Sequence, residues 1–136
     1  MVKNIEDESL DSIYTTRKYT MVDKKHYETV VQGMREAVLN GTCRAANLPD
    51  IEVCGKTGTA QNRGKDHSAF MGFAPMNDPK IAVAVYVENG GFGAVYGVPI
   101  GALIMEKFLT GTLTEESEKK ANDIQQRVIY YGNQER

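Results

Sequence analysis

The chain has 136 residues and a formal net charge of −2, with 41% hydrophobic and 25% charged residues. This length and composition predict one globular domain with a modest core. The near-neutral charge excludes the strongly basic surface that nucleic acid or an anionic membrane would need. No apolar run is long enough to cross a bilayer, and the charged first residues are not those of a signal peptide.

The N-terminal third is predicted to hold an extended segment and one helix. Residues 1–22 are polar and without period, so we expect an extended lead-in. Asp23 is a candidate N-cap for a helix over 24–39, and Gly41 suits its C′ position. The apolar face of this helix consists of Tyr27, Val30, Val31, Met34 and Val38, which recur at helical spacing.

Three strands are predicted in the middle of the chain, over 51–61, 68–74 and 80–88. Asn77-Asp78-Pro79 is a turn signal, so the second and third strands should form an antiparallel hairpin. The third strand is apolar on both faces, and we expect it to be covered on both sides. A flexible break is expected at 90–93, which is rich in glycine.

Two helices are predicted after the strands. Pro99 suits a first helical position, and Gly111 closes this helix. Its apolar face consists of Ile100, Leu103, Ile104, Phe108 and Leu109. Thr114 is a candidate N-cap of the last helix, so residues 112–136 read as a charged C-terminal helix and tail. The predicted class is α+β, with a small antiparallel sheet of about three strands packed with helices.

Gly55-Lys56-Thr57-Gly58-Thr59 is the motif that carries chemistry. A nucleotide-binding P-loop is excluded, because the glycine that it needs five positions before Gly55 is Asp50. An ammonium and two hydroxyls on one extended segment can instead hold a carboxylate. A backbone N–H of such a strand can stabilise an oxyanion, and a glycine lets a substrate approach the backbone.

Lys56-Thr57-Gly58 matches the lysine-threonine-glycine box of serine β-lactamases and penicillin-binding proteins. The surrounding sequence extends this match: Tyr27 through Val38 with Gly41-Thr42, Gly58-Thr59-Ala60-Gln61, His67-Ser68-Ala69-Phe70 and Gly72-Phe73-Ala74-Pro75. Over roughly 20–111 the chain resembles the C-terminal part of the transpeptidase domain of class B penicillin-binding proteins, of the elongation type in the penicillin-binding protein 2 group. The resemblance implies a piece of the β-lactamase/transpeptidase-like fold, with residues 23–111 as the box-bearing part.

The resemblance also implies a function for the parent protein. It would be a D,D-transpeptidase that cross-links peptidoglycan stem peptides through a serine acyl-enzyme and binds β-lactams. Lys56 and Thr59 would be catalytic, and Thr57, Gly58 and Thr59 would bind substrate, without metal or organic cofactor. The parent would sit in the cytoplasmic membrane through an N-terminal anchor absent from this chain, face the periplasm or cell-wall side, and work beside cell-wall elongation proteins.

The chain departs from the family at the nucleophile. The family places a Ser-x-x-Lys pair and a Ser/Tyr-x-Asn box before the lysine-threonine-glycine box. Here the only Ser-x-x-Lys is Ser117 to Lys120, which comes after the box and is interpreted as a solvated helix face. Tyr131-x-Asn133 also comes after it. We therefore expect the chain alone to be inactive, as the C-terminal part of a larger enzyme.

Two alternatives stay open in the sequence, and two further expectations concern His67 and the third strand. The chain could belong to a β-lactamase or a β-lactam sensor, or be a non-catalytic module that binds cell-wall peptide or a protein partner. Cys43 and Cys54 could pair, or could be two small buried thiols. His67 reads as a histidine at a strand end rather than a catalytic base. Finally, the family pairs the third strand with N-terminal strands that this chain lacks, so its apolar edge would be open. We expect that edge to associate with a copy or to be covered by the lead-in.

Overall fold

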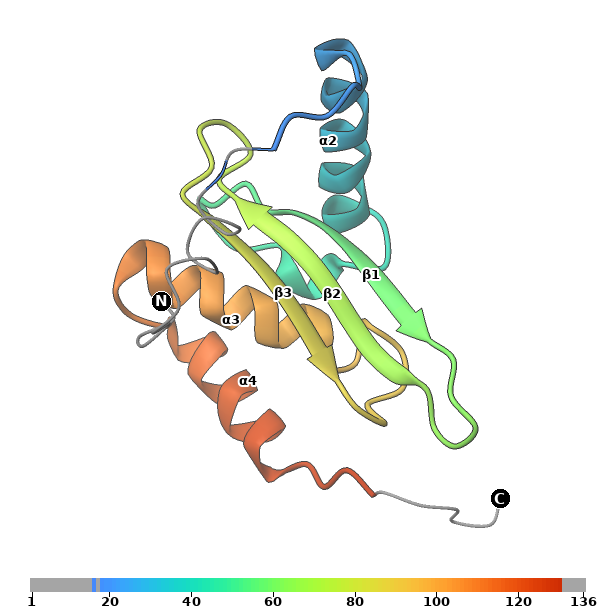
Figure 1. The fold of residues 1–136 in the computed structure, drawn as a ribbon. Helices are drawn as coiled ribbons and strands as arrows, with labels where there is room; N and C mark the ends of the chain where they lie inside the picture. The colour runs from blue at the N-terminus through green and yellow to red at the C-terminus, as the bar shows by residue number, and fades with distance from the viewer. Residues whose placement is uncertain (1–15, 17, 131–136) are drawn as a thin grey trace.

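The computed structural model describes residue 16 and residues 18–130. A three-stranded antiparallel sheet in the order β1-β2-β3 packs with helices (Figure 1). The strands are β1 (Cys54–Ala60), β2 (His67–Ala74) and β3 (Ile81–Val87), and the helices are α2 (Lys24–Leu39), α3 (Gly97–Thr110) and α4 (Glu115–Gln126), with a short 3-10 helix η1 (Arg44–Ala46). The predicted α+β class and the three-stranded sheet are confirmed.

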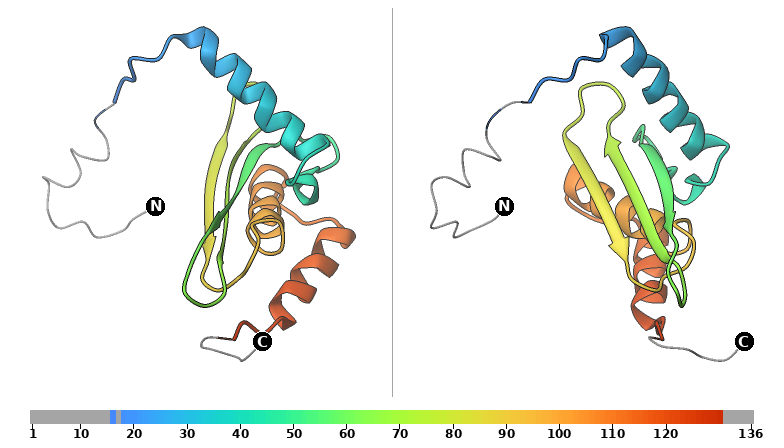
Figure 2. Two further views of the ribbon diagram at one scale, coloured as in Figure 1. Left: turned by 90° about the vertical axis from the view of Figure 1, so that its right-hand side faces the viewer. Right: turned by 45° about the vertical axis from the view of Figure 1, so that its right-hand side comes forward.

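The two faces of the sheet differ in their cover. Phe70 on β2 lies opposite Thr57 on β1 and Val85 on β3, so these side chains share one face. Helix α3 packs against that face so closely that a Cβ added at Gly101 would lie 2.5 Å from the Phe70 ring. Figure 2 shows α3 and α4 on this side, which we call the core face. No described helix covers the centre of the opposite side, which we call the open face.

The hydrophobic core lies between the sheet, α3, η1 and the C-terminal end of α2. Its buried members are Val38, Cys43, Ala46, Val53, Phe70, Ala74, Val98, Ala102 and Met105. Cys43 and Cys54 are both fully buried free thiols, which confirms the second of the two cysteine interpretations. Burial raises the pKa of each thiol, so both stay protonated at neutral pH.

Helix α2 has the predicted bounds, but its ends are built differently from the expectation. Asp23 occupies the N-cap position without a side-chain capping bond. Gly41 does not adopt the left-handed conformation; it is needed because an added Cβ would lie 2.8 Å from the Cα of Ala37. Tyr27 and Val30 are 44% and 59% exposed, because the first turns of α2 extend past the sheet (Figure 1).

The ends of α3 and α4 agree with the predicted ends more closely than those of α2 do. Helix α3 begins at Gly97, two residues earlier than predicted, and Pro99 still lies in the first turn, where its missing N–H costs no helical bond. Gly111 closes α3 in the left-handed conformation, with φ of 80°. Thr114 caps α4 as predicted, because its hydroxyl accepts from the Ser117 N–H at 3.3 Å.

The expectation that β3 is covered on both sides was wrong. Ala82, Ala84 and Tyr86 are exposed on the open face, while the alternate residues are half-buried beneath α3. The reason is that α3 is the described helix that packs on β3, and it covers one side of the strand.

No described helix is long and apolar enough to span a membrane.

Candidate functional site

The lysine-threonine-glycine box occupies β1, an edge strand whose partner among the described strands is β2 alone. Side chains alternate along a strand, so Lys56 and Gly58 belong to the open face, whereas Thr57 and Thr59 belong to the core face. The box therefore reaches both sides of one strand edge. An edge strand keeps a row of backbone N–H and C=O groups unpaired, so a ligand at this edge can meet them together with the ammonium and the hydroxyls.

Lys56 is exposed beside a groove on the open face. Its Nζ donates to the Thr57 carbonyl oxygen at 2.9 Å, and no carboxylate among the described residues pairs with it. The groove has a volume of about 280 Å³ and is mostly apolar. Its lining residues are Lys56, Thr57, Gly58, Ala69, Phe70, Met71, Ala84, Val85 and Tyr86. An ammonium at the rim of an apolar groove suits a ligand with a carboxylate and an apolar body.

Thr57 is held by a residue that the sequence did not assign to the site. Its hydroxyl oxygen lies 2.8 Å from that of Thr42, which follows α2 through Gly41. One of the two hydroxyls donates to the other, which limits the rotation of both. The sequence contained a signal for this, because Gly41-Thr42 is part of the resemblance, but fifteen positions separate Thr42 from Thr57.

Gly93 is a second residue that the sequence did not assign to the site. An added Cβ at Gly93 would lie 2.6 Å from the Gly58 carbonyl oxygen and 2.4 Å from that of Ala69. Gly58 has more room, because its own Cβ would meet the Ala69 Cβ at 3.3 Å. The expected flexible break is therefore a packed loop that supports the box from the core face.

Ser68 fastens this loop to the sheet. Its side chain is buried; the hydroxyl donates to the Phe92 carbonyl oxygen at 2.9 Å and accepts from the Gly97 N–H at 3.0 Å. The two bonds join β2 to the segment before α3 and to the first residue of α3. Because Thr59 lies opposite Ser68, the hydrogen bonds of Ser68 lie next to the end of the box. Thr59 itself is exposed, and its hydroxyl has no partner among the described residues.

The Ser-x-x-Lys and Tyr-x-Asn matches that follow the lysine-threonine-glycine box gain no support as site residues. Ser117 is 4% exposed at the start of α4, and Lys120 pairs with Glu116 at 2.8 Å. The prediction of an exposed helix face was wrong for Ser117, which packs towards Glu106 of α3. Ser117 is still excluded as a nucleophile. Tyr131 and Asn133 lie outside the described residues.

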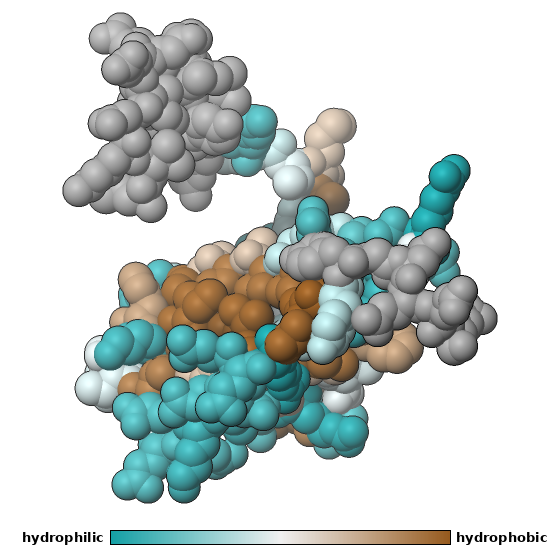
Figure 3. Space-filling view, turned by 90° about the horizontal axis from the view of Figure 1, so that it is seen from below, coloured by the Kyte–Doolittle hydropathy of each residue, from teal (hydrophilic) through white to brown (hydrophobic). Residues whose placement is uncertain are grey.

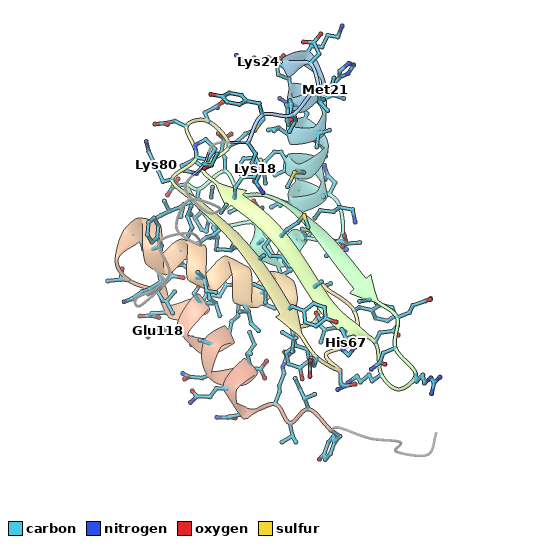
Figure 4. The ribbon with its side chains drawn as sticks, in the orientation of Figure 1. Lys18, Met21, Lys24, His67, Lys80 and Glu118 are labelled. Atoms are coloured by element: carbon cyan, nitrogen blue, oxygen red, sulfur yellow. The ribbon has the colours of Figure 1, made fainter. Side chains whose placement is uncertain are left out.

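His67 has a structural partner, in agreement with its interpretation as a strand-end residue. Its Nδ1 accepts from the Asn89 N–H at 3.0 Å, and its ring lies 5.3 Å from that of Tyr86. Figure 4 shows it at the start of β2, at the end of the sheet far from Lys80. These contacts join the start of β2 to Tyr86 of β3 and to Asn89 after it.

Comparison with known proteins agrees with this geometry. The family model of the penicillin binding protein transpeptidase domain matches residues 1–109, so the match reaches further towards the N-terminus than the resemblance over 20–111. The peptidoglycan D,D-transpeptidase MrdA of Acinetobacter baumannii is 40% identical over 44% of this chain and 12% of its own length. Stage V sporulation protein D of Bacillus subtilis is 32% identical over 83% of this chain and 20% of its own.

Solved structures show the same likeness. Penicillin-binding protein 2 of Pseudomonas aeruginosa, in complex with WCK 5153, is 39% identical with a TM-score of 0.56 and covers 72% of this chain and 23% of its own. Penicillin-binding protein A of Mycobacterium tuberculosis, as a ceftriaxone acyl-enzyme complex, is 30% identical with a TM-score of 0.60. The match covers 70% of this chain and 24% of that protein's chain. The chain thus spans less than a quarter of each relative.

Three comparisons indicate the same family as the lysine-threonine-glycine box on β1: the family model matches most of the chain, the curated relatives include D,D-transpeptidases, and the fold is shared. The chain therefore belongs to the penicillin-binding protein transpeptidase domain family, in the class B group that includes penicillin-binding protein 2.

Proposed function

We propose that this chain supplies the box-bearing wall of a serine D,D-transpeptidase site that cross-links peptidoglycan stem peptides and is acylated by β-lactams. The observation that carries the proposal is the position of Lys56-Thr57-Gly58-Thr59 on an exposed strand edge beside an apolar groove. The names of the curated relatives favour a transpeptidase over a β-lactamase, a sensor or a non-catalytic binding module.

Each box residue has a role that its chemistry suits. The hydroxyls of Thr57 and Thr59 donate to the substrate carboxylate, and the Lys56 ammonium raises the local positive potential for it and for neighbouring polar groups of the complete site. The Thr59 N–H donates to the oxyanion of the tetrahedral intermediate. Gly58 keeps the strand free of a side chain where the substrate passes. None of these roles needs a metal or an organic cofactor.

The nucleophile and its lysine base come from residues outside this chain in this proposal, because the 136 residues hold no Ser-x-x-Lys before the box. The parent then carries the membrane anchor, faces the cell wall and works with elongation proteins. The isolated chain forms no covalent adduct with a β-lactam and does not turn over a chromogenic cephalosporin. An adduct in the intact mass of the pure chain after incubation with penicillin would contradict this division of the site.

The roles of the box are tested in a longer product of the same gene that carries a Ser-x-x-Lys. Thr57→Val should slow acylation by a fluorescent penicillin about ten- to hundredfold, because a hydrogen bond to a charged group is lost. Thr112→Val makes the same chemical change on an exposed residue outside the site and should leave the rate unchanged. Equal rates for both variants would remove Thr57 from the substrate-binding role.

A further inference from the structure

Helix α4 is fastened to the rest of the molecule mainly through polar contacts at its two ends. Figure 3 shows its surface as mostly hydrophilic, and Ser117 is its one buried residue. A helix with so little apolar burial depends on specific polar contacts for its position. At the start of α4 the Thr114 N–H donates to Oε1 of Glu106 at 2.9 Å. At the end of α4 the contacts come from Arg127.

Arg127 contacts the segment that joins β3 to α3. Its Nη1 donates to the Val95 carbonyl oxygen at 3.2 Å, and its guanidinium carbon lies 5.5 Å from the centre of the Tyr96 ring. Asp123, one turn earlier on α4, accepts hydrogen bonds from both Nε and Nη2 of Arg127. This ion pair holds the planar guanidinium in one orientation, with its Nη1 and its face turned towards the segment.

The same segment packs on the box, and we call residues 92–96 the supporting segment. An added Cβ at Gly93 would lie 2.6 Å from the Gly58 carbonyl oxygen, so Gly93 rests directly on β1. The supporting segment is compact, because the Val95 N–H donates to the Phe92 carbonyl oxygen at 2.9 Å. The Val98 N–H donates to the Gly93 carbonyl oxygen at 3.0 Å. A displacement of Val95 is therefore expected to move Gly93 as well.

Gly58 and Thr59 share one planar peptide group. Its carbonyl oxygen belongs to Gly58 and its N–H belongs to Thr59, and in a trans peptide the two point in opposite directions. A contact that fixes the Gly58 oxygen therefore also fixes the direction of the Thr59 N–H. This N–H is the donor to the oxyanion in the proposed function, and a hydrogen bond weakens steeply when its donor is misdirected.

Two contacts hold the supporting segment from different sides. Ser68 of β2 holds it from the sheet, through the hydrogen bond to the Phe92 carbonyl oxygen. Arg127 holds it from α4. The side chains of Phe92 and Val95 are 70% and 41% exposed, so their burial contributes little to the position of the segment. The buried ring of Tyr96 is the surface on which Arg127 lies.

We propose that Arg127 is a positioning residue for the oxyanion donor of the box. Arg127 holds the supporting segment against β1, and Gly93 of this segment holds the peptide group between Gly58 and Thr59. The inference rests on the proposed transpeptidase function. It gives a role to α4, which lies after residues 1–109 that the family model matches. Arg127 acts through the supporting segment and does not touch the substrate.

The first test uses the 136-residue chain and does not depend on its catalytic function. Arg127→Ala should speed amide hydrogen exchange at Val95 and Val98 about tenfold, because the loss of a hydrogen bond from a charged group frees the supporting segment. Amides at the centre of β2 should keep their exchange rates. Lys119→Ala removes an exposed cation from the same helix and should change none of these rates. Nuclear magnetic resonance of the three proteins measures the exchange.

The second test uses the longer product of the same gene that carries a Ser-x-x-Lys. Rapid mixing with a fluorescent penicillin separates the Kd of the first complex from the rate constant of acylation. Arg127→Ala should lower the rate constant about tenfold and leave Kd within about twofold, because the oxyanion forms only during acylation. Arg127→Lys keeps a cation at the Tyr96 ring and a donor for the Val95 carbonyl, so it should recover most of the rate. Lys119→Ala should match the original protein.

Four results would overturn the proposal. The first is faster exchange confined to α4, with unchanged rates at Val95 and Val98. The second is an unchanged acylation rate constant in Arg127→Ala while the original longer protein is acylated, which would leave the proposed function in place. The third is a loss that lies wholly in Kd, which would make Arg127 part of substrate binding. The fourth is an original longer protein that is not acylated at all, which would contradict the proposed function as well.

Discussion

The contact between Thr42 and Thr57 determines how the box presents its first hydroxyl. A hydroxyl that must meet a carboxylate loses less entropy on binding if its rotation is already restricted. Thr42 supplies that restriction from outside the sheet, through a hydroxyl–hydroxyl distance of 2.8 Å. The residue therefore positions Thr57 without needing to touch the substrate.

This contact predicts a measurable coupling in the isolated chain. Thr42→Val and Thr57→Val should each lower the free energy of unfolding by about 1 kcal/mol, the net value of one hydrogen bond. The double variant should lose less than the sum of the two, because the same bond is removed twice. Chemical denaturation of the four proteins measures this, with Thr112→Val as the control. Strictly additive losses would show that the two hydroxyls do not interact.

Among the contacts between secondary-structure elements, the one that Glu106 makes joins α3 to α4. It is 3% exposed, and its Oε1 accepts from the Thr114 N–H at 2.9 Å. Burial alone would raise the pKa of Glu106, but hydrogen bonds from Ser117 and Thr114 and the charge of Lys120 outweigh it. The pKa therefore lies below its usual value. The ionised carboxylate thus fastens the start of α4 to the body of α3.

This lowered pKa has a defined consequence for stability. A carboxyl whose pKa is lower in the folded state stabilises the fold above the usual glutamate range, and the contribution is lost as the pH falls through the folded-state value. Glu106→Gln should lower the free energy of unfolding by about 1–3 kcal/mol near pH 7, and the difference should shrink in acid. Glu118→Gln, on the exposed side of α4 (Figure 4), is the control. A loss that is independent of pH would contradict this account.

Two glycines inside helices should respond to the same substitution in opposite directions. Gly33 of α2 has nothing within 4 Å of an added Cβ, so Gly33→Ala should stabilise the chain by about 0.5–1 kcal/mol through helix propensity. Gly101 of α3 packs on the Phe70 ring, so Gly101→Ala should destabilise it by about 1–3 kcal/mol. Thermal or denaturant unfolding of both variants measures this. A stabilising Gly101→Ala would mean that α3 does not pack closely on β2.

At the scale of the whole molecule, local patterns predicted the elements well. Helical spacing gave α2 its bounds, and Gly111 and Thr114 marked the ends of α3 and α4, because caps act within a few residues. The alternation in β3 predicted a strand but not its exposed face. What covers a face depends on residues far away in the sequence, and among the described helices α3 packs on one side of β3.

The candidate site was likewise predictable in its local motif and not in the contacts that folding brings to it. The box could be read from residue types, whereas its place on an edge strand is a finding of the structure, in which β1 pairs with β2. Thr42 and Gly93 could not be assigned, because their contacts with Thr57 and Gly58 arise only when α2 and the loop after β3 fold against β1. The roles of Lys56, Thr57, Gly58 and Thr59 remain predictions, since each depends on a nucleophile that the chain does not contain.

The described part of the chain has the features expected of one part of a larger site: an open sheet face, two strand edges and a lysine-threonine-glycine box with no Ser-x-x-Lys before it in the sequence. The sequence of the coding DNA immediately upstream of Met1 tests this claim most directly. We predict an in-frame extension that carries Ser-x-x-Lys, followed by Ser-x-Asn or Tyr-x-Asn. An in-frame stop codon directly before Met1, with neither box encoded upstream, would contradict the transpeptidase account and leave a binding module.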